Sequence, residues 1–565
     1  MITTQTHSER IDDLPLIIYW LRQMKVASMI DQHLPVPHGN RQGLSYGELA
    51  VLLLTYIVSE ADHRMCCVEK WVCEHHRSLE KITGWKIAEK EATDDRCGDL
   101  LKTMGKPERI SEMSISISKY LVKAYELPTE KGRSDTTSIR VYHQISEREE
   151  KSSLIQFGYS KNRRPDLRQY RQMLATLDPL GMPLLGATLA GNGTDESEYV
   201  PTWRKMTEII GHREFLYLAD SKASTWENRA QIHEEGGIYY FPLAMSQPRP
   251  KLLADWVNNP PTEVIKIVEK EQGESPPEEI GLAFEVPLGN IWVNSETKKR
   301  YQWLERWLVV KSNALASRKI RGLDNRLVKG EKELLSLKKR SGKDEKLLEE
   351  KIRDVLKKHR LTSYIEYSIQ KKISYSKVYK GRGSRSDPGS YRRVRQVDLI
   401  LSYTRCFPEI EAFRALAGWR LYVTNATSER LSLTEAIKSY QDQWQPERGF
   451  HRFKKGRLSA LPIYFRDEEK IQGLMFLLTI ALRVFTLMEF VVRRQLHQSQ
   501  SSVAGLYEGN PKRTTDRPTA EKMLRAFRNI TLYIHRDGQR EISFRELSPT
   551  TNFRVNECSK VYLYY

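Results

Sequence analysis

The chain has 565 residues, 39% of them hydrophobic, and its 91 lysines and arginines exceed its 72 acidic residues to give a formal net charge of +19. This length is enough for several domains, and the excess charge favours a polyanionic partner such as nucleic acid, although an RNA-binding protein or a membrane-surface protein has the same charge signature. The six cysteines are scattered without a disulfide framework, which excludes a disulfide-stabilised scaffold and fits a reducing cytosol.

The N-terminus and the apolar segments of the sequence favour neither a signal peptide nor a membrane span. The first ten residues are polar and lack an apolar signal region. The most apolar run, Ile471 to Val492, is interrupted by Arg483 and Glu489, so we expect a buried helix and no membrane span. Cysteines and histidines cluster between Cys66 and His76 but lack paired Cys-x2-Cys spacing, which argues against a zinc site.

Residues 1–127 are predicted to form an α-helical domain. Leu14 to Leu34 is amphipathic, and Ser45 and Glu48 form a capping box before an apolar run. Arg109 to Tyr125 has the pattern of a further helix. Such a domain suits DNA recognition by a helix-turn-helix, or dimerisation and packing alone, and the sequence leaves both open.

Residues 128–245 are predicted to alternate strands and helices. A strand begins near Asp135, and a hairpin follows from Gln172 to Leu189. After a helix, a short strand of buried type ends at Asp220, and the strand at Tyr239 to Leu243 is expected to be the last of this core. Acidic groups at the C-terminal ends of strands are well placed for active sites in open α/β sheets.

Residues 246–428 are predicted to be an inserted domain. Turns are expected from Gln247 to Pro277, and a strand at Trp307 to Lys311. A charged helical hairpin then covers Ala314 to Arg360, and its leucines at heptad-like steps suit either a dimer contact or packing on the same chain. Strand-like stretches return at Tyr364 to Ile373 and at Val394 to Tyr403.

Residues 429–494 are predicted to complete the core, and residues 495–565 to form a linker and a small C-terminal subdomain. The core segment carries a motif of four residues: Tyr440, Gln443, Glu447 and Lys454. Their spacings of 3, 4 and 7 residues place them on one face of a helix. An acid among basic and aromatic groups suits a metal held beside a phosphodiester, although a solvated basic helix has the same pattern.

The spacing Tyr-x2-Gln-x3-Glu-x6-Lys resembles the Tyr-x2-Arg-x3-Glu-x6-Lys signature of DDE transposases encoded by bacterial insertion sequences, the IS-four superfamily. Gln443 stands where the signature has Arg, and it brings hydrogen-bond donors without charge. The strand at Asp135 resembles the first catalytic motif of this family, and Asp220 matches its second aspartate. The basic loop Gly158 to Arg168 and the strand at Trp419 resemble further segments of these enzymes.

The resemblance implies an α/β ribonuclease H-like catalytic core with an α-helical N-terminal domain and a large inserted domain of strands and a helical hairpin. It implies catalytic and metal-ligating roles for Asp135, Asp220 and Glu447, which would hold two Mg²⁺ or Mn²⁺ ions. The rival acids near the core neither end a strand nor match a catalytic motif: Asp166, Asp195, Glu196 and Glu198.

Contacts to DNA are expected from the catalytic helix, the basic loop and the tryptophan strand: Tyr440, Gln443, Arg448, Lys454, Lys455, Lys161, Arg163, Arg164 and Trp419. For Trp419, stacking on a flipped base and burial in its own strand are both open.

The expected function is that of a cytoplasmic DNA transposase that acts on double-stranded DNA as a homodimer. It would bind the terminal inverted repeats of an insertion sequence, cut the transposon ends and join their 3′ ends to target DNA. Two alternatives stay open: a DNA-binding repressor of the same fold without strand transfer, and a ribonuclease H-like nuclease. Three ordered carboxylates favour catalysis, because DNA binding alone gains nothing from acids placed beside phosphates.

Overall fold

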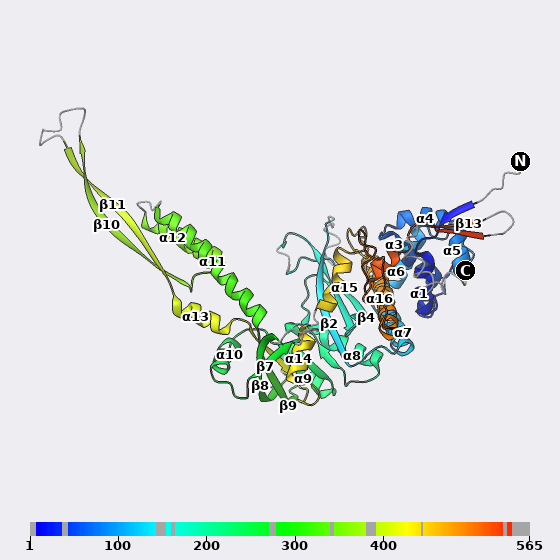
Figure 1. Ribbon diagram of the computed structural model, residues 1–565, viewed down its shortest axis with the longest axis horizontal. Coiled ribbons are helices and arrows are strands. Elements are labelled where there is room, and N and C mark those ends of the chain that lie inside the picture. The colour runs from blue at the N-terminus through cyan, green and yellow to red at the C-terminus, as the bar shows by residue number, and fades with distance from the viewer. Residues whose placement is uncertain are drawn as a thin grey trace.

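The computed structural model describes residues 7–36, 43–142, 154–159, 164–269, 278–294, 296–339, 344–379, 391–441, 444–534 and 540–544 (Figure 1). Within these residues the centre of the protein is a mixed nine-stranded sheet in the order β4-β3-β2-β5-β6-β12-β9-β8-β7. Its strands are β2 (Lys131–Arg140), β3 (Gln169–Leu177), β4 (Met182–Ala190), β5 (Leu216–Leu218), β6 (Ile238–Pro242), β7 (Ile265–Glu269), β8 (Glu278–Val293), β9 (Arg300–Ser312) and β12 (Trp419–Thr424).

The sheet combines two parts that the sequence predicts as separate domains. β2, β5 and β6 are parallel, and β3 and β4 form the predicted antiparallel hairpin. β6 is not the last strand, because β12 pairs with it on one side and with β9 on the other, both antiparallel. The inserted strands therefore extend the core sheet, and the stretch expected to be turns contains β7 and the helix α10 (Arg249–Asn258).

Helices cover both faces of the sheet, because alternate strand residues are apolar on both sides. On one face, Leu218 and Tyr240 pack with Ile437 of α14 (Leu433–Gln441). On the other face, Tyr217 and Tyr239 belong to the main core with α8 (Tyr199–Ile210) and α9 (Trp226–Glu234). The helix α15 (Trp444–Lys454) follows α14 and contacts β2.

The N-terminal helices are α1 (Leu14–Gln23), α2 (Val26–Asp31), α3 (Tyr46–Glu60), α4 (Val68–Glu74), α5 (His76–Thr83), α6 (Asp94–Met104) and α7 (Pro107–Tyr125). Four of them, α1, α3, α6 and α7, pack against α16 (Glu468–Gln498), the predicted buried helix, and the other N-terminal helices pack on these. By length and composition α16 alone among the described helices could cross a membrane, yet 83% of its apolar window is buried in the protein. Gly473 lets α6 approach closely, since a Cβ there would lie 2.2 Å from the Leu101 carbonyl oxygen.

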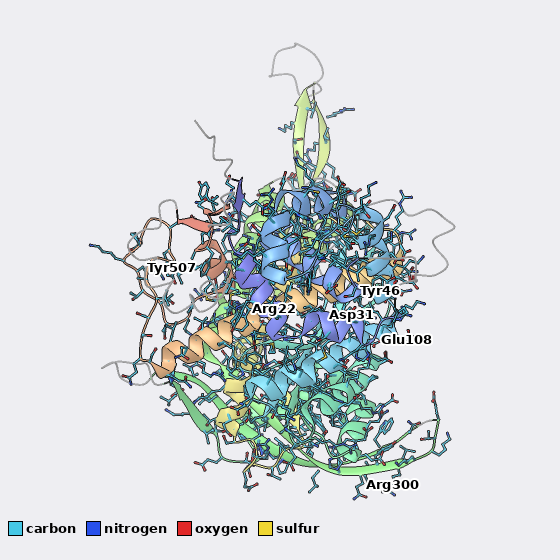
Figure 2. The ribbon with its side chains drawn as sticks, turned by 90° about the vertical axis from the view of Figure 1, so that its right-hand side faces the viewer. Arg22, Asp31, Tyr46, Glu108, Arg300 and Tyr507 are labelled. Carbon is cyan, nitrogen blue, oxygen red and sulfur yellow. The ribbon has the colours of Figure 1, made fainter. Side chains whose placement is uncertain are left out.

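The start of α3 confirms the predicted capping box. Ser45 accepts a hydrogen bond from the Glu48 backbone N–H, and Glu48 accepts one from the Ser45 backbone N–H. Asp31 of α2 receives a further bond from the Gly47 backbone N–H at 2.7 Å, and Figure 2 shows Asp31 near Tyr46 at this helix start. The carboxylates satisfy the unpaired N–H groups of the first turn and fix α2 against α3.

The two ends of the described chain meet in a small sheet. β1 (His7–Arg10), which the sequence does not predict, pairs with β13 (Ile530–Ile534), and β13 pairs with β14 (Arg540–Phe544). The predicted C-terminal helix is α17 (Ala520–Arg525). The C-terminal strands thus join the N-terminal region and do not form a subdomain of their own.

An arm projects from the sheet (Figure 1). It consists of the helical hairpin α11 (Asn313–Lys339) and α12 (Glu345–His359), the β-ribbon of β10 (Ile365–Tyr379) and β11 (Tyr391–Arg405), and α13 (Phe407–Leu416). Buried leucines at the heptad-like steps pack within the arm, Leu323, Leu327 and Leu334 against Ile352 and Leu401 among others. The hairpin therefore packs on its own chain, one of the two predicted alternatives.

A buried carboxylate ties the inserted strands to the core. Glu305 of β9 pairs with Arg229 of α9 at 2.5 Å, and both side chains are fully buried. Trp303 donates to Glu305 at 3.0 Å, and Asn290 of β8 and Tyr239 of β6 donate to it as well. These donors offset the cost of burying the charge.

Replacing Arg229 tests this cluster. R229M is expected to destabilise the protein by about 3–5 kcal/mol, because Glu305 would remain buried without its cation. Urea unfolding measures the change. The matched control is R204M, whose arginine is half-exposed in its pair with Glu235 and should cost less than about 1 kcal/mol. Equal losses for the two variants would contradict the assignment.

Candidate active site

Asp135 and Asp220 lie at the same level on neighbouring parallel strands. β2 and β5 are paired with Arg133 opposite Leu218. Continuing this register by two residues puts Asp135 opposite Asp220, which follows the end of β5. Because neighbouring strands are about 4.8 Å apart, the register brings the two aspartates close together at the C-terminal end of β5.

Nearby donors hold both aspartates in place. Asp135 is half-buried, and its Oδ1 accepts a hydrogen bond from the Thr136 backbone N–H at 2.7 Å. Oδ1 of Asp220 accepts the Tyr199 hydroxyl at 2.5 Å and the Lys222 backbone N–H at 3.0 Å. Burial, followed by the charge of Asp220, raises the pKa of Tyr199 far above its usual value, so its hydroxyl donates as a neutral phenol.

Two hydrogen bonds fasten the segment that carries Glu447 across this region. Arg133, Asp135 and Thr137 share one face of β2, because side chains alternate along a strand. Arg133 donates to the carbonyl oxygen of Ser439 in α14, and Lys454 in α15 donates to the Thr137 hydroxyl. The anchored ends of the segment thus lie on either side of Asp135.

Glu447 lies between the two anchors, on the same side of the sheet as Asp135. Gly449 approaches β3 closely, since a Cβ there would lie 3.3 Å from Leu174, the residue opposite Asp135 in the sheet. Glu447 is half a turn before this contact, and its side chain is exposed.

The donor chemistry of these carboxylates fits Mg²⁺ or Mn²⁺, which prefer hard oxygen ligands. Register brings Asp135 and Asp220 together. Among the residues that the structure describes, however, no three His, Cys, Asp or Glu side chains converge to hold a metal ion, so Glu447 does not join the pair in this arrangement.

The rival acids are engaged elsewhere or peripheral. Asp195 is buried and accepts hydrogen bonds from Arg171 and, at 3.0 Å, from Lys222. Burial raises its pKa, but these bonds outweigh burial, so the pKa of Asp195 lies below its ordinary value. Asp166 pairs with Arg164 at 2.6 Å on the surface. The other two lie in the turn before α8: Glu196 and Glu198.

The residues expected to contact DNA have different surroundings. Lys455 is exposed, whereas Arg448 donates to buried Glu489 at 2.7 Å, and Arg164 is paired with Asp166. Three of the expected residues lie outside the described residues: Lys161, Arg163 and Gln443. The side chain of Tyr440 also lies outside them.

Trp419 is only 7% exposed and meets Phe284 edge-on, with ring centroids 5.7 Å apart. This burial favours the packing alternative for Trp419 over stacking on a flipped base.

A basic cavity that the sequence analysis did not single out lies on the same face of the sheet as α14. Its volume is about 450 Å³. Its lining has no acidic residue, and three arginines line it: Arg318, Arg321 and Arg420. Lys311 also borders the cavity, but its side chain lies over the Trp419 ring on the other face of the sheet. Tyr240 and Ile437, which pack together on the α14 face, also line it. The cations come from two distant segments, so only strand pairing brings them together. The basic run that follows the predicted strand at 307–311 is the signal that could have found most of them.

Residues 134–484, more than half of the chain, match the family model described as Transposase DDE domain. The chain belongs to the DDE transposase family. The matched segment begins one residue before Asp135 and continues through Asp220 and Glu447 into α16.

A search of curated proteins gives no match. Among solved structures, the chain matches a piggyBac transposase synaptic complex with hairpin DNA, determined by cryo-EM. The two chains are 7% identical, and the alignment covers 93% of this chain and 82% of that chain with a TM-score of 0.34.

The ion pairs of Asp195 predict how the stability of the transposase depends on pH. Because its pKa is lower in the folded chain than its ordinary value of 3.8, Asp195 stabilises the fold above pH 3.8 and loses this contribution as the pH falls through the folded pKa. D195N should therefore destabilise the protein by about 1.5–3 kcal/mol at neutral pH, and by less below about pH 4.

Urea unfolding of the parent chain and D195N at several pH values measures this difference. D166N is the control, because Asp166 is exposed and should have little effect. A difference between parent and D195N that stays constant down to pH 3 contradicts the assignment.

Proposed function

We propose that this transposase cuts and joins DNA as a member of the IS-four superfamily of insertion-sequence enzymes, on a ribonuclease H-like core. Tyr440, Glu447 and Lys454 keep the spacing of that signature within the segment matched by the family model, and Gln443 replaces its arginine. The order of the core elements supports the proposal: an antiparallel hairpin beside β2, then helices alternating with the parallel strands β5 and β6.

The single observation that carries the proposal is the shared register of Asp135 and Asp220 beneath the anchored segment that contains Glu447. Two acids on adjacent strands and a third on a helix across them suit phosphodiester chemistry. When bound, two Mg²⁺ or Mn²⁺ ions would lower the pKa of the attacking water and stabilise the leaving 3′ oxygen. Asp135, Asp220 and Glu447 would hold these ions, with Glu447 joining once DNA is bound.

The chain's cations would position the DNA strand. Lys454, bonded to Thr137, places a positive charge on the face of β2 that carries Asp135, where it would contact a phosphate. Lys455 is exposed beside it, and Tyr440 and Gln443 would add contacts without charge. In this position Lys454 would orient the scissile strand and compensate the negative charge of the neighbouring acids.

The basic cavity would extend this DNA path. It includes Arg420 of β12, three strands from β2, so it lies about 14 Å across the sheet from Asp135. That distance is about four base-pair rises of 3.4 Å. A duplex lying over the α14 face would therefore reach both places.

The remaining roles complete the proposal. The N-terminal helices would bind the terminal inverted repeats, and a homodimer in the cytoplasm would hold two transposon ends. The proposed domains are residues 1–127 for end binding, 128–245 and 429–494 for the catalytic core, 246–428 for the insertion, and 495–565 for the linker and C-terminal part.

Cleavage of a labelled duplex that carries the element's own terminal repeat tests this function. The unaltered transposase should cut at the transposon end with Mg²⁺ or Mn²⁺. E447Q should lower the cutting rate at least about 100-fold while leaving DNA binding intact, because it removes a metal ligand and keeps the shape of the side chain. E196Q, which alters another exposed glutamate, should cut normally.

Two outcomes would contradict the proposal. Specific binding of the repeat without cutting by the unaltered chain would favour a DNA-binding repressor of the same fold. Equal cutting by E447Q and E196Q would remove Glu447 from the catalytic set.

A further inference from the structure

The β-ribbon of the arm extends beyond the helices that support it. β10 and β11 are paired in register from Ile365 opposite Arg405 to Tyr379 opposite Tyr391. Fifteen residues in each strand give a ribbon about 50 Å long. Figure 1 shows it projecting past α11 and α12, and Figure 2 shows from a second direction that it extends past the body of the protein.

One face of the ribbon changes along its length from buried apolar side chains to exposed cationic ones. Near the body, Ile365, Leu399 and Leu401 are buried against the helical hairpin. Lys371 then pairs with Glu345, the first residue of α12, at 2.5 Å. Beyond this ion pair neither helix of the hairpin supports the ribbon (Figure 1).

We call residues 373–379 and 391–397 the distal ribbon. It contains no acidic residue and four cations: Lys377, Arg392, Arg393 and Arg395. Three of the four share the face that is apolar nearer the body, because Lys377 and Arg393 are opposite each other and Arg395 is opposite Tyr375. All four cations are exposed, and Tyr375 is 68% exposed.

The free chain compensates this arrangement only in part: Lys377 lies over the Tyr391 ring at 4.6 Å, but it also faces a like charge. Like charges directly opposite each other in a ribbon destabilise it by about 0.2–1 kcal/mol, and Lys377 faces Arg393. Scattered charges on either face would be enough to keep a ribbon edge from aggregating. Cations gathered on one exposed face suit instead an anionic partner such as a phosphate backbone.

We propose that the distal ribbon binds double-stranded DNA, with Lys377, Arg393 and Arg395 on phosphates and the ribbon lying along the major groove. A two-stranded ribbon fits the major groove of B-form DNA. This inference rests on the proposed function, which supplies DNA as the partner. α11 separates the distal ribbon from the end of β9 by about 40 Å, a distance of about 12 base-pair rises, so a duplex longer than this is needed to reach both the distal ribbon and the sheet.

Two triple variants of the full chain test the proposal. K377Q/R393Q/R395Q removes three charges from the distal ribbon. K346Q/K351Q/K357Q removes three exposed charges from the neighbouring helix α12 and is the matched control. Binding of duplexes of about 10 and about 40 base pairs is measured over a range of salt concentrations, because only the longer duplex spans both contacts.

On the longer duplex, the ribbon variant should reduce the slope of log K against log salt by about 2.7, which corresponds to three phosphate contacts. The control should keep the parent slope. On the short duplex all three proteins should bind alike, which also shows that the ribbon variant is folded. An RNA duplex of the same length should show little difference, because its deep, narrow major groove excludes a ribbon.

Equal salt slopes for the ribbon variant and the control on long DNA would overturn the proposal. An equal loss on the RNA duplex would overturn its groove-binding part. If the unaltered chain cuts transposon ends but the ribbon variant behaves like the control, only the ribbon proposal is wrong. If the unaltered chain binds neither duplex, both the ribbon proposal and the proposed function are wrong.

Discussion

The pairing of β12 is the constraint on which the rest of this protein depends. The chain leaves the core after β6, builds three more strands and the arm, and returns as β12 between β6 and β9. Thr424 secures the return by donating to the Tyr239 carbonyl oxygen at 2.6 Å. α14 begins nine residues after Thr424. This short connection brings Glu447 back over the strand that carries Asp135, although Glu447 follows Asp220 by 227 residues in the sequence.

Charge is distributed according to burial. Inside the protein several cations are matched by acids, as Arg229 is by Glu305 and Arg452 is by Glu489. Arg483, which is fully buried, instead donates to the carbonyl oxygens of Pro183 and Leu184. The large positive excess of the chain therefore concentrates on surfaces, including the α14 face and the distal ribbon. Because the excess charge lies on the surface, the fold tolerates its net charge. The same surface charge attracts DNA over a long range, and salt weakens this attraction.

Local patterns predicted much of the core. Strand and helix periodicity located β2, the β3–β4 hairpin, β5 and α16. Resemblance to the family's motifs selected Asp135, Asp220 and Glu447, whose roles are still predictions. Non-local pairing could not be predicted in this way. β1 pairs with a strand more than 500 residues away, and the inserted strands join the core sheet through β12. Arg448 likewise belongs to a basic run in the sequence, but its partner Glu489 lies on another helix.

The central claim is that Asp135, Asp220 and Glu447 together form a two-metal site. Anomalous scattering from crystals of the transposase with transposon-end DNA and Mn²⁺ tests it most directly, with E447Q crystals for comparison. The account predicts two manganese peaks about 3.5–4 Å apart between these carboxylates and the scissile phosphate, and the loss of one peak in E447Q. Manganese bound elsewhere, for example at Asp195, or two unchanged peaks in E447Q, would contradict it.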